Sequence, residues 1–287
     1  MPLSALLLLV LSALLHAAYY SFYKRSADKQ VFAWWFLLVA VIIYSPALIL
    51  NQPVIPAQGW LCLLLSGLAD TAYFVIVGKA LEQGDLSVVY PLARGAPPLL
   101  ITLGAVLFLG ERLTVWGLAG ILLVTAGLYL VNVRSGYDLL RPLYSLKEGA
   151  SQLALLASVS VSVYSVIDKV GLRYVDPFAY GYLMLLVTLL SFTPYILLTK
   201  HRAHLAAEWW ISKLGIGVAG VFVLLTYFLA LAAMRLSYVS YVGSVRSVNV
   251  IFGALLGALL LKEPCGATRV LASSLVFAGV LLIGLVG

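Results

Sequence analysis

The sequence predicts an all-α membrane protein of ten transmembrane helices, built as two five-helix repeats of opposite orientation. Three observations predict this fold class. The chain is 63% hydrophobic and only 10% charged, which is far less charge than a soluble domain of 287 residues carries. Its apolar residues form ten continuous runs of about the length that crosses ~30 Å of hydrocarbon. The two halves of the chain also match each other.

The ten runs define the expected helices in chain order. They are residues 3–22, 31–50, 58–81, 86–109, 114–133, 150–170, 176–199, 208–234, 238–261 and 267–286. These runs are too long and too continuous for the alternating strands of a membrane β-barrel. The first run lacks a basic leading region and a small-residue cleavage site, so we interpret it as a retained helix.

The longest polar stretch divides the expected helices equally. Residues 134–149 separate a first repeat, 1–133, from a second repeat, 150–287, and each holds five runs. An odd number of spans gives the two repeats opposite orientations in the membrane. A shift of 152 residues aligns Arg94 with Arg246, inside the fourth and ninth runs. Inverted repeats of this kind are typical of secondary transporters.

The two arginines are the main candidates for substrate binding. A charge in hydrocarbon is costly, so Arg94 and Arg246 are functional hypotheses. Each lies eight residues into its run, some 6 Å short of the midpoint at 1.5 Å per residue. Inversion places one on each side of the midplane, where guanidinium groups suit a carboxylate or phosphate. The alternative is that each arginine pairs internally or reaches to an interface.

Two further side chains are candidates for coupling transport to a proton. Asp70, in the third run, is the deepest acid that the sequence predicts, and Tyr73 shares its helical face. His16 lies in the middle of the first run and has a side chain that titrates near neutral pH. The alternatives are a structural salt bridge between Asp70 and Arg94, and a hydrogen-bonded packing role for His16.

The fourth and ninth runs hold other candidate residues. Tyr90 is expected to line a cavity, and Asn249, one turn after Arg246, can donate a hydrogen bond to a substrate. Pro97 and Pro98 remove amide donors and predict a kink.

Several charges near the ends of the runs have blander interpretations. Glu111 and Arg112 lie at a tight turn, where capping is the default role. Asp168 and Lys169 lie near the end of the sixth run, where such a pair is more often interfacial than part of a cavity mouth.

Composition and motifs exclude several classes of function. The 18 Lys and Arg residues are scattered over short loops, which favours contact with lipid headgroups and argues against nucleic acid. The pair His201 and His204 has no third ligand, and the two cysteines have no metal spacing, so no metal is expected. No nucleotide loop or hydrolase motif occurs, which predicts no cofactor and no enzymatic activity.

Two strings carry a family resemblance. Asp85-Leu86-Ser87-Val88-Val89-Tyr90-Pro91-Leu92-Ala93-Arg94 and the turn Leu109-Gly110-Glu111-Arg112-Leu113-Thr114 resemble the drug/metabolite transporter superfamily, and within it the EamA-like families. The second half departs from the turn motif, with Lys262-Glu263-Pro264 in place of Gly-Glu-Arg. Paired EamA repeats would cover nearly the whole chain. Residues 90–95 further resemble members found with phosphonate-utilisation genes.

The resemblance implies a central cavity lined mainly by helices 1, 3, 4, 6, 8 and 9, and transport of a small-molecule metabolite without ATP hydrolysis. We therefore predict a secondary transporter for a small organic anion or zwitterion in a bacterial plasma (inner) membrane. The alternatives are a non-transporting assembly subunit and an intramembrane enzyme. Lys and Arg concentrate in the loops after odd-numbered helices, which predicts that both termini lie outside the cytoplasm.

Overall fold

A computed structural model describes residues 1–51, 53–83, 92–93, 95–131, 147–252 and 267–286. These residues are mostly α-helical and include no β-strand. Every predicted run contains a described helix. The helices are α1 (Leu3–Arg25), α2 (Lys29–Asn51), α3 (Ala57–Gln83), α5 (Pro97–Leu109), α6 (Val115–Leu130), α8 (Gly149–Gly171), α9 (Pro177–Thr199), α10 (Arg202–Leu236), α11 (Val239–Arg246) and α13 (Ala267–Val286).

Six of these helices are long and apolar enough to cross a membrane, namely α1, α2, α3, α8, α9 and α10. Helices α5 and α6 and the Val270–Leu285 part of α13 are shorter apolar helices. Helix α10 has 35 residues, so at 1.5 Å per residue it is about 52 Å long, well beyond the hydrocarbon thickness. It starts at Arg202, before the predicted apolar run, and its first turns include Glu208, which is buried and accepts hydrogen bonds from Ser212 Oγ and the Asp28 amide.

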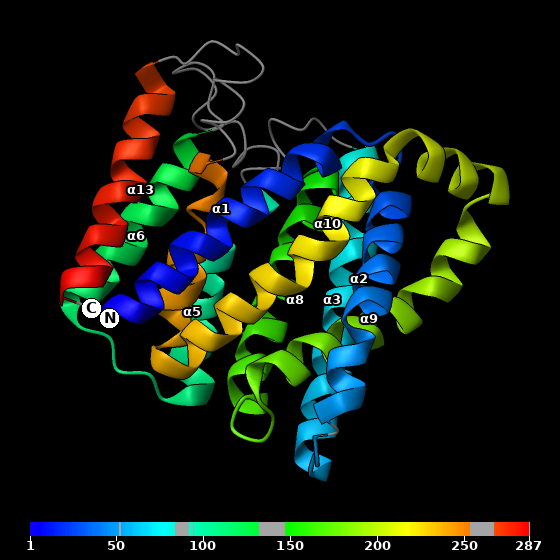
Figure 1. Ribbon diagram of the computed structural model, residues 1–287. Helices are drawn as coiled ribbons and strands as arrows, with labels where there is room; N and C mark the ends of the chain where they lie inside the picture. Colours follow the sequence, from blue (N-terminus) through cyan, green and yellow to red (C-terminus); the bar gives the residue numbers. More distant parts are fainter. Residues whose placement is uncertain (52, 84–91, 94, 132–146, 253–266, 287) are drawn as a thin grey trace.

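The helices of the two halves interleave (Figure 1). Helix α1 packs along α10, and α8 packs along α3 in the same way. Helix α2 packs on α10 as α9 packs on α3, while α6 packs against α13 and α5 against α11. The same contacts result when each helix is replaced by its counterpart in the other half, that is α1 by α8, α2 by α9, α3 by α10, α5 by α11 and α6 by α13, and the reverse. The two halves therefore form one bundle with an internal pseudosymmetry.

Both termini lie at the same end of the bundle (Figure 1), and the Met1 amine donates a hydrogen bond to the Ile283 carbonyl at 3.4 Å. Nearby, α6 and α13 approach very closely. A Cβ atom on Gly279 would lie 2.6 Å from the carbonyl oxygen of Gly120, and a Cβ on Gly120 would lie 2.8 Å from that of Gly279. Small residues at this crossing allow the two backbones to touch, as is common for helices packed in membranes.

Both arginine-bearing segments are interrupted near the same aligned position. In the first half a bend at Ala96 precedes α5, which begins with Pro97 and Pro98. Proline lacks an amide donor, but the amides of the first helical turn have no acceptor within the helix, so no helical hydrogen bond is lost there. The interruption therefore falls beside the two prolines, as the sequence predicts. In the second half α11 ends at Arg246, and a turn at residues 247–248 follows, although no proline is present.

Candidate functional site

A cavity of about 160 Å³ lies at the centre of the bundle, between the two halves. Its walls come mainly from α1, α3, α5, α8, α10 and α11, with smaller contributions from α2 and α9. An engineered protein cavity of roughly 150 Å³ holds benzene, so this space suits a small metabolite. It contains five of the seven predicted site residues, namely His16, Asp70, Tyr73, Arg246 and Asn249.

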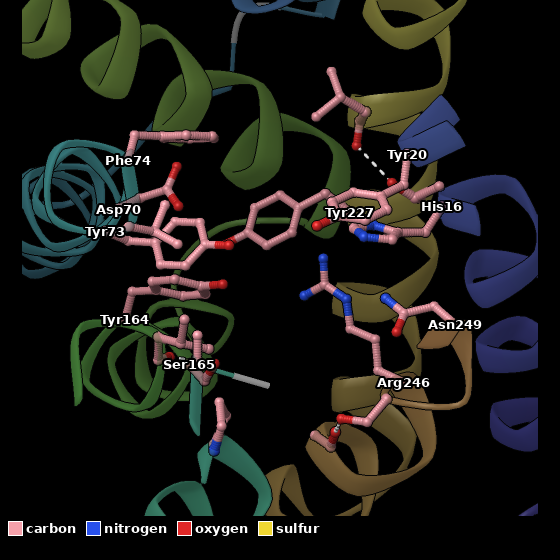
Figure 2. Close-up of a pocket in the computed structure, with 18 of the residues that line it drawn as sticks. His16, Tyr20, Asp70, Tyr73, Phe74, Tyr164, Ser165, Tyr227, Arg246 and Asn249 are labelled. Carbon is pink, nitrogen blue, oxygen red and sulfur yellow. Dashed lines mark hydrogen bonds between the residues drawn. The ribbon is translucent and has the colours of Figure 1, made fainter. Parts of the chain in front are cut away.

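Arg246 is the last residue of α11, and its guanidinium points into the cavity (Figure 2). The guanidinium carbon lies 5.5 Å from the centre of the Tyr227 ring, on α10, in a cation–π contact. Among the described residues no carboxylate forms an ion pair with this guanidinium, and no acceptor forms a hydrogen bond with it. The five N–H donors of the guanidinium group are thus available to a substrate.

Glu111 fixes the helix that carries Arg246. Its carboxylate accepts hydrogen bonds from the amide of Val239 at 2.6 Å and the amide of Ser240 at 3.3 Å, and from the Ser240 hydroxyl at 2.5 Å. These are the first residues of α11, whose amides have no acceptor within the helix. The predicted capping role of Glu111 is confirmed, and the helix that it caps belongs to the other half of the chain.

Asp70 lies on the opposite wall of the cavity from Arg246 (Figure 2). It is 7% exposed, and its Oδ2 accepts a hydrogen bond from Thr188 Oγ1 at 3.2 Å. No ion pair of Asp70 occurs within the part of the chain that the structure describes. Tyr73, one turn further along α3, lines the same wall as predicted from the helical spacing.

Of the four remaining candidate residues, the structure describes His16 and Asn249 but not Tyr90 and Arg94. A hydrogen bond of 3.0 Å joins His16 Nδ1 and the Tyr19 hydroxyl, and the His16 ring stacks at 5.8 Å on Tyr20. Asn249 lies beside Arg246 on the same wall (Figure 2). Tyr90 and Arg94 fall outside the described residues.

Asp168 is a buried acid whose environment was not predicted. Asp168 is 0% exposed, compared with 7% for Asp70, so the fold shields it from solvent at least as fully. Its carboxylate accepts hydrogen bonds from Ser66, Tyr180 and Tyr227. One signal was available in the sequence: Asp168 follows Tyr164 by four residues, so both side chains lie on one face of α8.

Reciprocal caps join the C-terminal ends of α8 and α10. Lys169 Nζ donates to the carbonyls of Met234 and Ser237 at the end of α10. Arg235 donates in return to the carbonyl of Leu172, which caps α8, at 3.2 Å and to that of Val175, in the turn after α8, at 2.9 Å. Cations favour helix C-termini, where carbonyls lack partners and the helix dipole is negative. Lys169 and Arg235 therefore clamp the ends of α8 and α10 together.

An ion-pair network joins the C-terminal ends of α3 and α9 to the loop between α1 and α2. Lys200 Nζ lies 2.7 Å from Asp28 Oδ2 and 3.3 Å from Glu82 Oε1. Burial raises the pKa of Asp28, but Lys200 and the amides of Val31 and Gln30 outweigh it and hold that pKa below its ordinary value. Burial lowers the pKa of Lys200, but the two carboxylates outweigh it and raise that pKa.

An apolar helical bundle, made of two matching halves around a cavity with charged walls, defines a multi-pass membrane transporter. The profile of the EamA-like transporter family matches this chain twice, over residues 3–133 and 150–285, and the chain belongs to that family. The predicted resemblance is thereby confirmed.

The chain is also similar to one curated protein and to one solved structure. A Sinorhizobium protein described as "Uncharacterized transporter in cobO 3'region" is 33% identical over 96 residues, which are 33% of this chain and 67% of the relative. A crystal structure described only as that of a protein matches with a TM-score of 0.75 at 19% identity, covering 98% of this chain and 96% of the other. At that identity the match shows the fold alone.

Proposed function

We propose that this protein is a secondary transporter that moves a small organic anion or zwitterion across the membrane by alternating access. The observation that carries this proposal is the guanidinium of Arg246, which faces the cavity without an acid partner among the described residues. A carboxylate or phosphonate would occupy its N–H donors. A zwitterion, such as an amino acid or an aminophosphonate, would also direct its amine toward Asp70 on the opposite wall.

The exchange pattern of helix contacts supports two inverted five-helix repeats, 1–133 and 150–287. In such transporters the site lies at the interface of the repeats, and one repeat rocks against the other. The interruptions beside residues 96 and 247 resemble the broken helices that form ion and substrate sites in these folds. On this scheme Arg94 is the counterpart of Arg246 in the other access state.

A thermal-shift screen of the purified protein tests the substrate class. Phosphonates, organic acids and amino acids are compared with amines that lack an anionic group. We expect compounds with a carboxylate or phosphonate to raise the unfolding midpoint, and the same compounds to exchange across proteoliposomes in counterflow. Stabilisation by cationic amines alone would contradict the proposal.

Asp70→Asn is expected to abolish uptake driven by a pH gradient and to leave substrate exchange intact. If Asp70 carries the coupling proton, the amide cannot bind and release it, so uptake driven by a pH gradient is lost while counterflow exchange remains. Both activities are measured in the same liposomes, and His16→Gln is the parallel variant for the second candidate. An Asp70→Asn protein with the pH dependence of the wild type rules out Asp70 as the coupling residue.

We further propose a bacterial inner-membrane location with both termini outside the cytoplasm, because Lys and Arg concentrate in the loops on the other side. A C-terminal reporter that fluoresces only in the cytoplasm is expected to stay dark, while the same reporter in the 134–149 linker is expected to fluoresce. Bright signal from the C-terminal fusion reverses this orientation.

A further inference from the structure

Asp168 connects four helices behind the cavity wall. Its Oδ1 accepts the Ser66 hydroxyl from α3 at 2.5 Å and the Tyr180 hydroxyl from α9 at 3.0 Å. Its Oδ2 accepts the Tyr227 hydroxyl from α10 at 2.5 Å. No cation forms an ion pair with Asp168 in the described parts of the chain. Three hydroxyl donors are therefore the means by which the fold holds this buried acid.

A charge held in this way is costly compared with a neutral acceptor. A buried carboxylate with no cation in contact loses more hydration energy than an amide or hydroxyl of similar size, and the charge of Arg246 acts on Asp168 only at longer range. An ionisable group inside a membrane bundle is by default a functional residue. Two of its three donors, Ser66 and Tyr180, are not among the residues that line the cavity. Tyr227 is the donor that reaches both Asp168 and the cavity.

The ring of Tyr227 lies against the guanidinium of Arg246, 5.5 Å from its centre to the guanidinium carbon. A hydrogen bond from the phenol to a carboxylate polarises the ring, and it also fixes the ring plane. Both effects strengthen the attraction between the ring and the cation. The contacts thus run from Asp168 to Tyr227 to Arg246, from α8 through α10 to α11.

We propose that Asp168 is a positioning residue for Arg246 that acts through Tyr227. The carboxylate holds the phenol, and the phenol ring holds the guanidinium at the cavity wall with its N–H donors directed at the substrate. The assignment of Arg246 as the substrate contact rests on the proposed function, but the position of its guanidinium can be tested without any substrate.

Two tyrosine variants form a matched pair. Tyr227→Phe and Tyr180→Phe each remove one hydroxyl donor from the same carboxylate, but only Tyr227 contacts Arg246. Detergent-solubilised full-length protein is treated with phenylglyoxal, which modifies guanidinium groups, and the rate at each arginine is followed by peptide mass spectrometry. Arg235, which donates to Leu172 and Val175, is the internal reference.

In Tyr227→Phe we expect the rate at Arg246, relative to Arg235, to rise about fivefold, the size of one weakened cation–π contact. Asp168→Asn should also raise the relative modification rate at Arg246, whereas in Tyr180→Phe that rate should stay within about twofold of the wild-type rate. A rate at Arg246 that is unchanged in both Tyr227→Phe and Asp168→Asn, or raised equally by Tyr180→Phe, overturns the proposal.

Failure of the proposed function has a different signature. In that case no anionic compound stabilises the protein in the thermal-shift screen, whatever the modification rates are. When a stabilising anion has been found, its affinity for Tyr227→Phe is expected to fall about tenfold, while that for Tyr180→Phe is retained.

Discussion

Arg246→Ala is expected to reduce transport of the anionic substrate by roughly tenfold to a hundredfold, because hydrogen bonds to charged groups contribute about 1.5–3 kcal/mol each. The guanidinium faces the cavity, and no acid among the described residues forms a contact ion pair with it, so its truncation removes a substrate contact without leaving a salt-bridge partner exposed. Counterflow in proteoliposomes measures the loss. Asn249 beside it can still donate, so residual activity is expected.

The control for this variant is Arg246→Lys. A lysine keeps the charge but cannot form the paired, planar hydrogen bonds of a guanidinium, so it should restore only part of the activity. Expression and the unfolding midpoint should stay near those of the wild type in both variants. Full transport by Arg246→Ala would falsify the assignment of this residue to the substrate.

Gly279→Ala is expected to weaken the contact between α6 and α13 and to destabilise the protein by about 1–3 kcal/mol, the usual range for overpacking. The added Cβ would lie 2.6 Å from the carbonyl oxygen of Gly120 and 2.9 Å from the amide of Val124. Both are backbone atoms, so the clash cannot be relieved by rotating a side chain. The unfolding midpoint of the purified protein measures the effect.

Gly217→Ala in α10 is the matched control, because a Cβ at this helical position meets no atom within 4 Å. It should be neutral or slightly stabilising, since alanine favours a helix over glycine. Equal midpoints for the two alanine variants would mean that the α6–α13 backbone contact has no role in stability.

The helices could be predicted from the sequence because the signal is local. An apolar run long enough for the bilayer specifies a helix without reference to the rest of the chain, and every run contains one. The turn that ends α11 after Arg246 could not be predicted, because no proline or glycine occurs at residues 247–248. The first turns of α10 contain Glu208, which accepts a hydrogen bond from the amide of Asp28 in the distant loop between α1 and α2.

The candidate site could be predicted for charged residues within apolar runs, because burying a charge in a membrane is costly enough to indicate a function. Arg246 and Asp70 stand out in apolar runs, and both line the cavity. The environment of Asp168 was not predictable, because two of its donors are 59 and 102 residues away in sequence, on other helices. Its position near the end of a run favoured an interfacial role, whereas the fold covers it with Tyr180 and Tyr227.

The interleaving of the two halves determines the order in which the chain can assemble. Two polar groups of the first helices find their acceptors in the second half of the chain: Ser12 donates to the Thr226 carbonyl, and Trp35 donates to the Leu205 carbonyl, across 214 and 170 residues. During synthesis α1 and α2 must therefore wait in the bilayer, or beside an insertion chaperone, until α10 emerges. Such long-range closure makes folding slow, and a chain arrested after residue 133 would expose these unsatisfied groups to the cell's quality control.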